Sequence, residues 1–566
     1  MRIPALLLSL GLATCTAAPE VAQAPVAAAP EGVRFFDQGW SARDRQTFTG
    51  TPQGSFLMPL PWFAAMRRTD IDAPFIGDGL ARYGYLPGTG PLPVGFVPDG
   101  DSAEPQVGMT CAACHTGQLN IKGVAWRIDG GRSDADFQAF LTDLGSASRF
   151  TLDDPARFAA FSAAVLGPGA SPAATDRLRR DLSDWTGRYT GFMDRSLPDP
   201  AWGPGRLDAF GMIFNRVVGL DLGSTYDKAD APVRYPFIWD APRQDHTQWT
   251  GVARNGTYLR ALARNTGEVF GVFGVLTPKA GPNRTATYEN RVSLGGLQSL
   301  EEKLVTLRAP KWPEAAYPLD RALADRGGTV FAATCSGCHA SGPSRTVRNA
   351  WNTPLVDTKT DRRTFDHSQR SGSPGPLLGT QQPPLIGDRL TATEPKAAIL
   401  ANAVVGSLER AALRFDPAIR RAIERDFAED RLPLLGPAAT ALAPAGLAAD
   451  IADATRDLYK AADGAPGTAY EARRLTGIWA VAPYLHNGSV ASLRELLTSP
   501  SRRLARFAVG HRDFDPVNVG LETEPRPGRA TFVVDEAVGN GNGGHEYGTD
   551  LPEADKRALI EYLKTL

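Results

Sequence analysis

The chain has 566 residues, with 61 lysines and arginines against 62 aspartates and glutamates and a formal net charge of −1. This balance argues against nucleic acid as a partner, because binding to phosphates needs an excess of basic side chains. A chain of this length is too long for one hydrophobic core, so we expect two large domains.

The first residues predict an exported protein. Residues 3–13 form an apolar run that is too short to cross a bilayer and is typical of a secretory signal. The sequence ending at Cys15 resembles a bacterial lipobox, which would give a lipoprotein tethered to the membrane through lipidated Cys15. Cleavage after Ala18, which would release a soluble periplasmic protein, is the alternative. We predict a signal over 1–18, favour the lipoprotein, and expect an Ala/Pro-rich tether over 19–32. The expected location is the periplasm or cell envelope.

Two Cys-x-x-Cys-His motifs, ending at His115 and His339, predict two covalently attached haem c groups. In each motif the cysteines would form thioethers with the haem and the histidine would bind its iron. These cysteines are Cys111 and Cys114 in the first motif and Cys335 and Cys338 in the second. From the composition, one chance match has a probability on the order of 10⁻³. The alternatives are two dithiols or two halves of zinc sites, and the sequence offers no second half for a zinc site.

The region after the first motif predicts short regular elements. Apolar and polar residues alternate over 118–131 around Lys122-Gly123, which predicts a β-hairpin. Residues 134–144 and 155–166 have a helical pattern.

A proline-rich passage over 308–318 lies between the two motifs and resists both helix and central strand. We therefore predict an N-terminal haem domain over 33–312 and a C-terminal cytochrome c domain over 313–566. The predicted fold class is mainly α, with two cytochrome c-like haem domains, small β-hairpin excursions and long irregular loops.

Two helices are expected in the C-terminal domain. A helix over 320–334 places Gly327 and Phe331 one turn apart, as in helices that cross closely. A terminal helix over 550–566 carries one apolar stripe, and Asp550 and Glu553 predict a capping box. Packing of the terminal helix across the first is the usual cytochrome c arrangement.

The axial ligands follow by elimination. No methionine follows Met212, so the second haem cannot have the His/Met ligation of an ordinary electron carrier. His545, in a glycine-rich loop, is the predicted sixth iron ligand, with His486 as the alternative. His367 and His511 are expected at the surface. The second haem would then be an electron relay closed to substrate.

The first haem is the predicted reactive one. Before the domain boundary only His246 remains as a further histidine, so an open iron face is expected there, where dioxygen or peroxide binds. Phe237 and Trp239 are candidates for an apolar distal wall, with core packing as the alternative. Glu268 is the candidate acid/base for splitting an O–O bond, with a helix-start carboxylate as the alternative.

The chain resembles the di-haem cytochrome c peroxidase superfamily, and more closely its rubber-oxygenase-like (RoxA-type) di-haem c-type cytochromes. The resemblance lies in phrases around the motifs: Gly39-Trp-Ser, Ala81-Arg-Tyr-Gly-Tyr-Leu-Pro, Leu92-Pro-Val-Gly-Phe-Val, Arg127-Ile-Asp-Gly-Gly, Tyr484-Leu-His-Asn-Gly-Ser and Gly544-His-Glu-Tyr-Gly-Thr. It implies a reactive first haem, a His-ligated electron-transfer haem, an aromatic residue that relays electrons between them, and a calcium ion between the domains. Classical members carry a methionine after the Tyr-x-His-x-Gly phrase, and residues 496–502 lack one.

Three functions remain open. The first and favoured one is a peroxidase, which reduces hydrogen peroxide at the N-terminal haem with electrons from a small redox protein, a cytochrome c or cupredoxin, relayed through the C-terminal haem. The second is a haem dioxygenase that uses dioxygen to cleave alkene bonds of a hydrophobic substrate. The third is a non-catalytic electron carrier. The order rests on the family resemblance.

Overall fold

The computed structural model describes residues 32–340, 342–345, 347–381, 389–431 and 469–566. The predicted signal, Cys15 and almost all of the predicted tether lie outside these residues. None of the helices in the described ranges is both long and apolar enough to cross a membrane.

The N-terminal part builds two three-stranded sheets. β1 (Val33–Phe35) runs parallel to β6 (Val124–Asp129), which pairs antiparallel with β5 (Thr116–Ile121). This pair is the predicted hairpin, and the residues of its turn, Lys122 and Gly123, have positive φ angles of 50° and 79°, as a tight two-residue turn requires. The second sheet has the order β2 (Met58–Pro59), β4 (Gln106–Met109), β3 (Phe96–Asp99).

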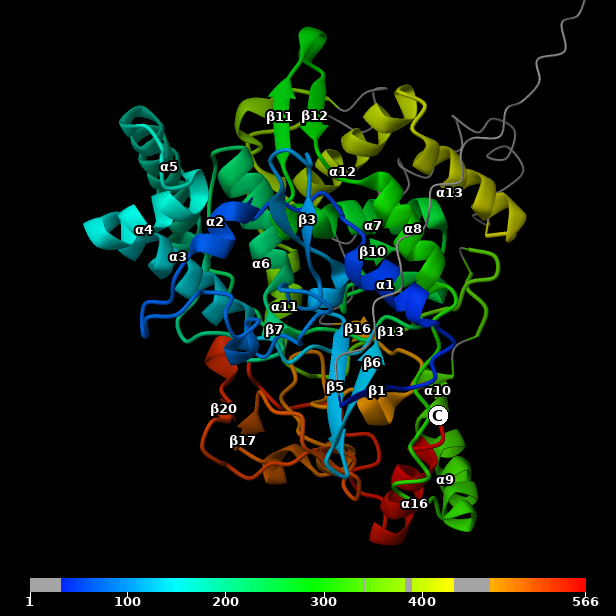
Figure 1. The fold of residues 1–566 in the computed structure, drawn as a ribbon. Helices are drawn as coiled ribbons and strands as arrows, with labels where there is room; N and C mark the ends of the chain where they lie inside the picture. The colour runs from blue at the N-terminus through cyan, green and yellow to red at the C-terminus, as the bar shows by residue number, and fades with distance from the viewer. Residues whose placement is uncertain (1–31, 341, 346, 382–388, 432–468) are drawn as a thin grey trace, which may run out of the picture.

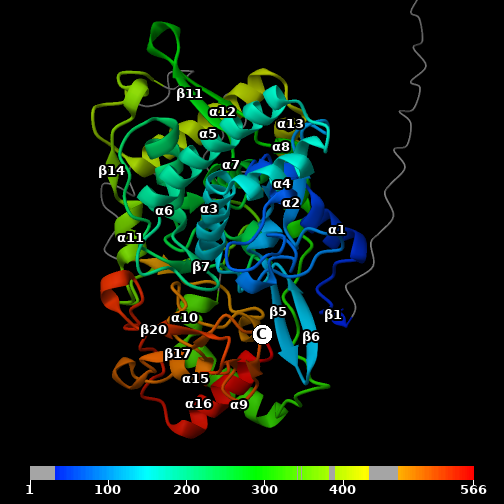
Figure 2. The same cartoon turned by 60° about the vertical axis from the view of Figure 1, so that its left-hand side comes forward.

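Helices dominate the end of the molecule that carries α3, α4 and α5 (Figures 1 and 2). The helices before the proline-rich passage are α1 (Ala42–Gly50), α2 (Leu60–Ala65), α3 (Phe137–Asp153), α4 (Pro155–Leu166), α5 (Pro172–Ser196), α6 (Ala209–Phe214), α7 (Tyr258–Gly271) and α8 (Leu294–Leu304). The predicted helix over 155–166 is confirmed, and the one over 134–144 is present but begins and ends later.

The later helices are α9 (Arg321–Thr334), α10 (Ser336–His339), α11 (Arg363–Ser368), α12 (Lys396–Leu413), α13 (Pro417–Ala428), α15 (Leu493–Leu496) and α16 (Glu553–Leu563). The remaining strands pair as β7 (Arg206–Leu207) with β8 (Val233–Arg234), β9 (His246–Thr247) with β10 (Ala253–Arg254), β11 (Leu276–Ala280) with β12 (Ala286–Asn290), β13 (Leu355–Val356) with β16 (Tyr470–Glu471), β14 (Ser371–Gly372) with β15 (Glu394–Pro395), β17 (Arg506–Val509) with β20 (Ala530–Val533), and β18 (Phe514–Asp515) with β19 (Gly520–Leu521).

The predicted mainly-α fold class is wrong. The structure is about 41% helix and 16% strand, and its strands form many small sheets of two or three strands in the described part of the chain. The 58 glycines and 45 prolines explain this pattern, because they interrupt helices and favour turns between short strands.

Three large hydrophobic clusters fill the interior. One joins the sheet of β1, β5 and β6 to residues 478–566, a second lies among α2 to α6, and a third joins α7 and α8 to α12 and α13. The first and third clusters draw on both sides of residue 312. The division into domains at that residue stays a prediction.

The crossing of α9 and α16 agrees with the cytochrome c arrangement expected from the sequence, and the two helices lie side by side in Figures 1 and 2. The Asp320 side chain caps α9 through the N–H of Leu323. The capping box predicted for the terminal helix is wrong, because α16 begins at Glu553 after Pro552 and has no side-chain cap. A Cβ on Gly327 would overlap the carbonyl group of Ala558, so the backbones touch at the crossing.

Replacing Gly327 with alanine is expected to destabilise the protein by about 2 kcal/mol or more, because neither helix can move away without unpacking the crossing. Gly187→Ala is the matched control. Gly187 lies in α5, where a Cβ would meet nothing within 4 Å, so alanine there is expected to stabilise by about 0.5–1 kcal/mol. Chemical denaturation of both variants tests this, and equal effects would contradict the close approach.

Candidate haem sites

The two Cys-x-x-Cys-His motifs fold in the same way. The backbone N–H of His115 donates to the carbonyl oxygen of Cys111 over 2.9 Å, and that of His339 donates to Cys335 over 3.0 Å. Each motif is therefore one helical turn, which brings its first cysteine and its histidine close together. Gly95 has a φ of 81°, and a Cβ there would overlap the backbone of Ala113, so the loop before β3 packs directly on the first motif.

Each motif histidine is held by a backbone carbonyl. Nδ1 of His115 lies 2.8 Å from the carbonyl oxygen of Pro236, and Nδ1 of His339 lies 2.7 Å from that of Arg473. A carbonyl accepts the Nδ1 proton and leaves Nε2 as the ligand atom, as in metal-binding histidines generally. Burial lowers the pKa of His115 to about 4 and also lowers the pKa of His339, which favours the neutral imidazole that binds a metal.

The four motif cysteines are free and partly accessible. Burial raises the pKa of Cys111 and of Cys114 to about 12 and that of Cys335 to about 11. A redox dithiol needs a lowered thiol pKa, so these shifts argue against the dithiol interpretation. Covalent attachment to a haem does not need a stable thiolate in the folded protein.

His545 faces His339. The centroids of their rings are 6.4 Å apart, and the ring planes are inclined by 47°. Two imidazoles on opposite sides of one metal ion, with metal–nitrogen bonds of about 2.0 Å, have ring centroids about 6 Å apart. Nδ1 of His545 is buried without a hydrogen-bond partner among the described residues, and burial lowers the pKa of His545 to about 4. The spacing and the neutral rings fit a haem iron between them.

The loop that carries His545 is firmly held. Gly544 has a φ of 70°, and a Cβ there would overlap the backbone of Lys359. The N–H of His545 donates to the carbonyl oxygen of Thr358 over 2.7 Å. The guanidinium group of Arg503 donates to the carbonyl oxygens of Gly544 and His545 over 2.9 and 3.1 Å. Close packing and these hydrogen bonds therefore fix the ring opposite His339.

The other histidines lie elsewhere. The His486 ring stacks on Tyr470 with centroids 4.0 Å apart, and burial lowers the pKa of His486 to about 3. The expectation that His367 lies at the surface is wrong, because its ring is 2% exposed and lies between Asp208 and Asp230. His511 is partly buried, and its Nδ1 accepts the N–H of Asp513.

Glu268 lies close to the first motif, on α7. Its charge contributes to the raised pKa of both Cys111 and Cys114. Its Oε1 accepts a hydrogen bond of 2.6 Å from Gln248 and lies 3.8 Å from Arg264. Desolvation raises the pKa of Glu268, although its side chain remains 39% accessible. A carboxyl group with a raised pKa beside the first motif is suited to take up and release a proton.

The backbone beside Glu268 is unusual. Gln248 and Trp249 have φ angles of 74° and 57°, in the left-handed region that residues other than glycine rarely adopt. The side chain of Gln248 is the one that holds Glu268, so the strained turn orients the candidate acid/base.

Phe237 and Trp239 stack on each other with ring centroids 4.6 Å apart, and each is 2% exposed. Phe237 directly follows Pro236, whose carbonyl oxygen accepts a hydrogen bond from Nδ1 of His115, and Trp239 lies two residues further on. Both side chains belong to the hydrophobic cluster that joins the sheet of β1, β5 and β6 to residues 478–566, which agrees with the core-packing alternative. Their part in a distal wall stays a prediction.

Asp208, Asp230 and His367 bring three ligand atoms within 4.8 Å of one another. Calcium prefers oxygen ligands, whereas this group contains an imidazole and Asp230 is already paired with Arg363. The group is better described as a charge network between Asp208 at the start of α6 and His367 in α11. A calcium ion stays an expectation from the family resemblance.

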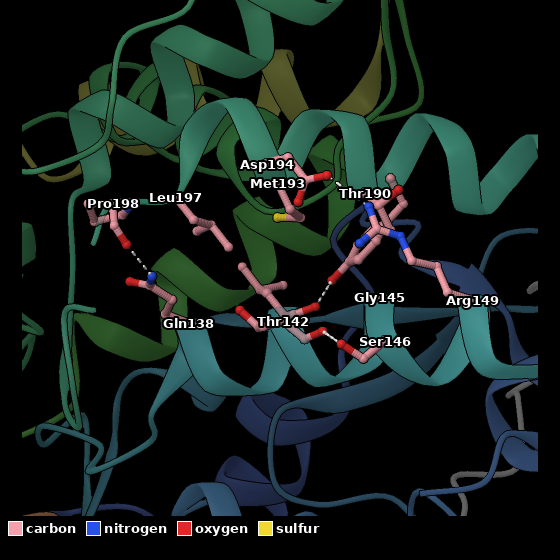
Figure 3. A pocket seen from close by; sticks show the side chains of 12 residues that line it. Gln138, Thr142, Gly145, Ser146, Arg149, Thr190, Met193, Asp194, Leu197 and Pro198 are labelled. Atoms are coloured by element: carbon pink, nitrogen blue, oxygen red, sulfur yellow. Dashed lines mark hydrogen bonds and ion pairs between the residues drawn. The ribbon is translucent and has the colours of Figure 1, made fainter. Parts of the chain in front are cut away.

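A cavity of about 290 Å³ lies between α3 and α5 (Figure 3). Hydrogen bonds from Gln138 to Pro198 and from Arg149 to Asp194 cross it. None of the residues expected to act at a haem lines it, and we assign it no role.

Several residues of the candidate sites were not anticipated from the sequence. Arg473 and Pro236 hold the motif histidines through their backbone carbonyl groups. Every residue has such a group, so no sequence motif identifies it. Arg264 contacts Glu268 from one turn earlier in α7, whereas Gln248 and Arg503 reach Glu268 and the His545 loop from other segments of the chain.

Two helical Cys-x-x-Cys-His turns with carbonyl-held histidines define a cytochrome c-like protein, whose cofactor is haem c and whose class is the haem-containing oxidoreductases. Residues 469–508 match the family model described as RoxA-like, cytochrome c-like. That segment contains Arg473, which holds His339, and Arg503, which holds His545.

The chain belongs to the family of the uncharacterized protein y4iJ of Sinorhizobium fredii (strain NBRC 101917 / NGR234), to which it is 31% identical over 586 residues, covering 94% of this chain and 93% of that protein. A shorter stretch of 56 residues is 45% identical to the uncharacterized protein y4iM of the same organism, covering 10% of this chain and 13% of that protein.

Proposed function

We propose that the protein is an exported oxidoreductase with two haem c groups, held by the motifs at His115 and His339, and that it reduces hydrogen peroxide at the first of them. A small redox protein, a cytochrome c or cupredoxin, delivers the electrons through the second. The protein resides in the periplasm or cell envelope, tethered through lipidated Cys15. The near-neutral charge is compatible with such partners.

The observation that carries this proposal is the asymmetry between the two motifs. His545 faces His339 and closes that site, so it serves as a relay. The ring contacts of the described residues pair His339 with His545 and His486 with Tyr470, and none of them joins His115 to another histidine. His115 therefore has no facing histidine in the described part of the chain. An iron held only by His115 keeps a coordination position for a small molecule.

The residues at the first motif support peroxide as the substrate. A haem bound there supplies the electrons and the iron that reduction of an O–O bond requires. Reduction of one hydrogen peroxide to two waters would consume two electrons from the small redox protein and two protons from solvent. Glu268 would take a proton from one peroxide oxygen and return it to the other, which leaves as water, because a carboxyl group with a raised pKa suits transfer in both directions. Gln248 fixes the carboxylate by its hydrogen bond, and Arg264 balances its charge.

The test combines a haem count with turnover. The pyridine haemochrome spectrum of the purified protein is expected to give two haem c groups per chain. Stopped-flow mixing with hydrogen peroxide is expected to oxidise reduced cytochrome c or a reduced cupredoxin at a stoichiometry of two electrons per peroxide. A protein with both haems that leaves these donors reduced is not a peroxidase of this kind.

A second candidate is a haem dioxygenase that cleaves alkene bonds, and the match of residues 469–508 to the RoxA-like model favours it. Phe237 and Trp239 are each 2% exposed and pack in a hydrophobic cluster, and a substrate wall would need their rings to line the open face. Incubation with polyisoprene or a carotenoid-like alkene under dioxygen distinguishes the two. Carbonyl products without peroxide turnover would favour the dioxygenase.

A further inference from the structure

One side chain, that of Arg473, connects the two backbone segments whose carbonyl groups hold the motif histidines. The carbonyl oxygen of Pro236 accepts a hydrogen bond from Nδ1 of His115. The next carbonyl along the chain, that of Phe237, accepts a hydrogen bond of 2.9 Å from Nη2 of Arg473. The carbonyl oxygen of Arg473 itself lies 2.7 Å from Nδ1 of His339. A continuous path of covalent bonds and three hydrogen bonds thus runs from one imidazole to the other.

Arg473 is held rigidly along this path. It is 8% exposed, its guanidinium group lies 4.2 Å from the centroid of the Phe237 ring, and Nη2 also donates to Oε1 of Gln244 over 2.7 Å. Its Nε lies 3.7 Å from the carboxylate of Glu471, which is itself buried. Burying an arginine costs desolvation free energy, and the planar guanidinium group suits a role that needs two fixed acceptors.

We propose that Arg473 is the positioning residue that locks the two motif histidines to each other, and that the path through it couples the two haem sites for electron transfer. The proposal rests on the proposed function, since it needs a haem at each motif. One electron enters at the site of His339 from a small redox protein, which is thereby oxidised by one electron. The same electron passes to the site of His115, which is reduced by one electron. No atom is transferred, and the bridging residues are unchanged.

Arg473→Lys tests the bridge. Lysine keeps the positive charge, but its flexible ammonium group lacks the rigid plane that lies over the Phe237 ring and aims one nitrogen, Nη2, at both the carbonyl of Phe237 and the amide oxygen of Gln244. Arg431→Lys is the matched control. Arg431 is 7% exposed and donates to the carbonyl oxygen of Pro242, but it contacts neither support of the histidines.

The measurement is the rate of electron redistribution between the haems after flash photolysis of carbon monoxide from the half-reduced protein. In Arg473→Lys this rate is expected to fall about tenfold or more, as for other residues that orient a metal-binding histidine. The electron paramagnetic resonance signal of the His339 site is also expected to shift. Arg431→Lys is expected to match the unchanged protein in both measurements.

The outcomes separate the two proposals. A wild-type protein with fewer than two haems, or one whose reduced form does not bind carbon monoxide, contradicts the proposed function and with it the bridge. If wild type meets both conditions and Arg473→Lys keeps both haems with an unchanged rate and signal, only the bridge is wrong. Should Arg473→Lys fail to fold, Gln244→Met removes the second acceptor of the same guanidinium group. It is expected to slow redistribution, and a wild-type rate in that variant overturns the bridge.

Discussion

Replacement of His545 by alanine is expected to convert the haem at His339 from low-spin to high-spin. The two rings are 6.4 Å apart in an arrangement that fits one iron between them, and removing one ring leaves that iron with a single imidazole. The low-spin signal in the electron paramagnetic resonance spectrum of the oxidised protein is expected to disappear, and the optical spectrum to respond to added cyanide at both haems. Both haems stay attached, because the motif cysteines are untouched.

Two further variants serve as controls for His545→Ala. His486→Ala removes the alternative ligand, whose ring stacks on Tyr470, and is expected to keep the low-spin signal. His511→Ala removes a histidine that hydrogen-bonds next to β18 and is also expected to keep it. Loss of the signal in His486→Ala, with its retention in His545→Ala, would transfer the ligand assignment to His486.

Glu268→Gln is expected to lower peroxide turnover by about 10²–10⁴-fold, the usual contribution of a positioned acid/base, without loss of haem. Glutamine keeps the size of the side chain and an acceptor oxygen for Gln248, but it cannot carry the proton. Steady-state oxidation of the reduced donor under saturating peroxide measures the effect. An unchanged rate would remove Glu268 from the reaction.

The pH dependence of peroxide turnover is an independent test of the role of Glu268. Glu268 must be ionised to take the first proton, and desolvation raises its pKa above the ordinary value. Turnover is therefore expected to rise with pH through that raised pKa and to be lost as the pH falls below it. In Glu268→Gln this acid limb is expected to vanish. Glu289→Gln, at a surface carboxylate paired with Lys279 and Arg410, is expected to keep both the rate and the limb.

Local patterns in the sequence predicted local structure well. The hairpin of β5 and β6 and the helix over 155–166 depend on residues close in the chain, and both are present. The fold class depends on how the segments between these elements pair with one another. The strands that make the fold a mixture of helix and sheet are mostly two to five residues long, too short to show a clear alternation of apolar and polar residues. The close crossing of α9 and α16 was predictable because it needs a small residue, Gly327, at a fixed distance from Phe331.

The same distinction applies to the candidate sites. The Cys-x-x-Cys-His motifs are contiguous, so the sequence was enough to find them. His545 was predicted by elimination, because no methionine follows Met212 and four histidines follow His339, and the ligand assignment stays a prediction. The carbonyls of Pro236 and Arg473 could not be found in this way, since a backbone acceptor leaves no trace in residue type. The contact between His115 and the carbonyl of Pro236 likewise spans 121 residues, beyond the reach of any local pattern.

The central claim is that one haem site is closed by His545 and the other is open. The electron paramagnetic resonance spectrum of the fully oxidised wild-type protein tests it most directly. We predict one high-spin and one low-spin haem in equal amounts, with only the high-spin signal changing on addition of cyanide. Two low-spin haems, neither of which responds to cyanide, would contradict the account.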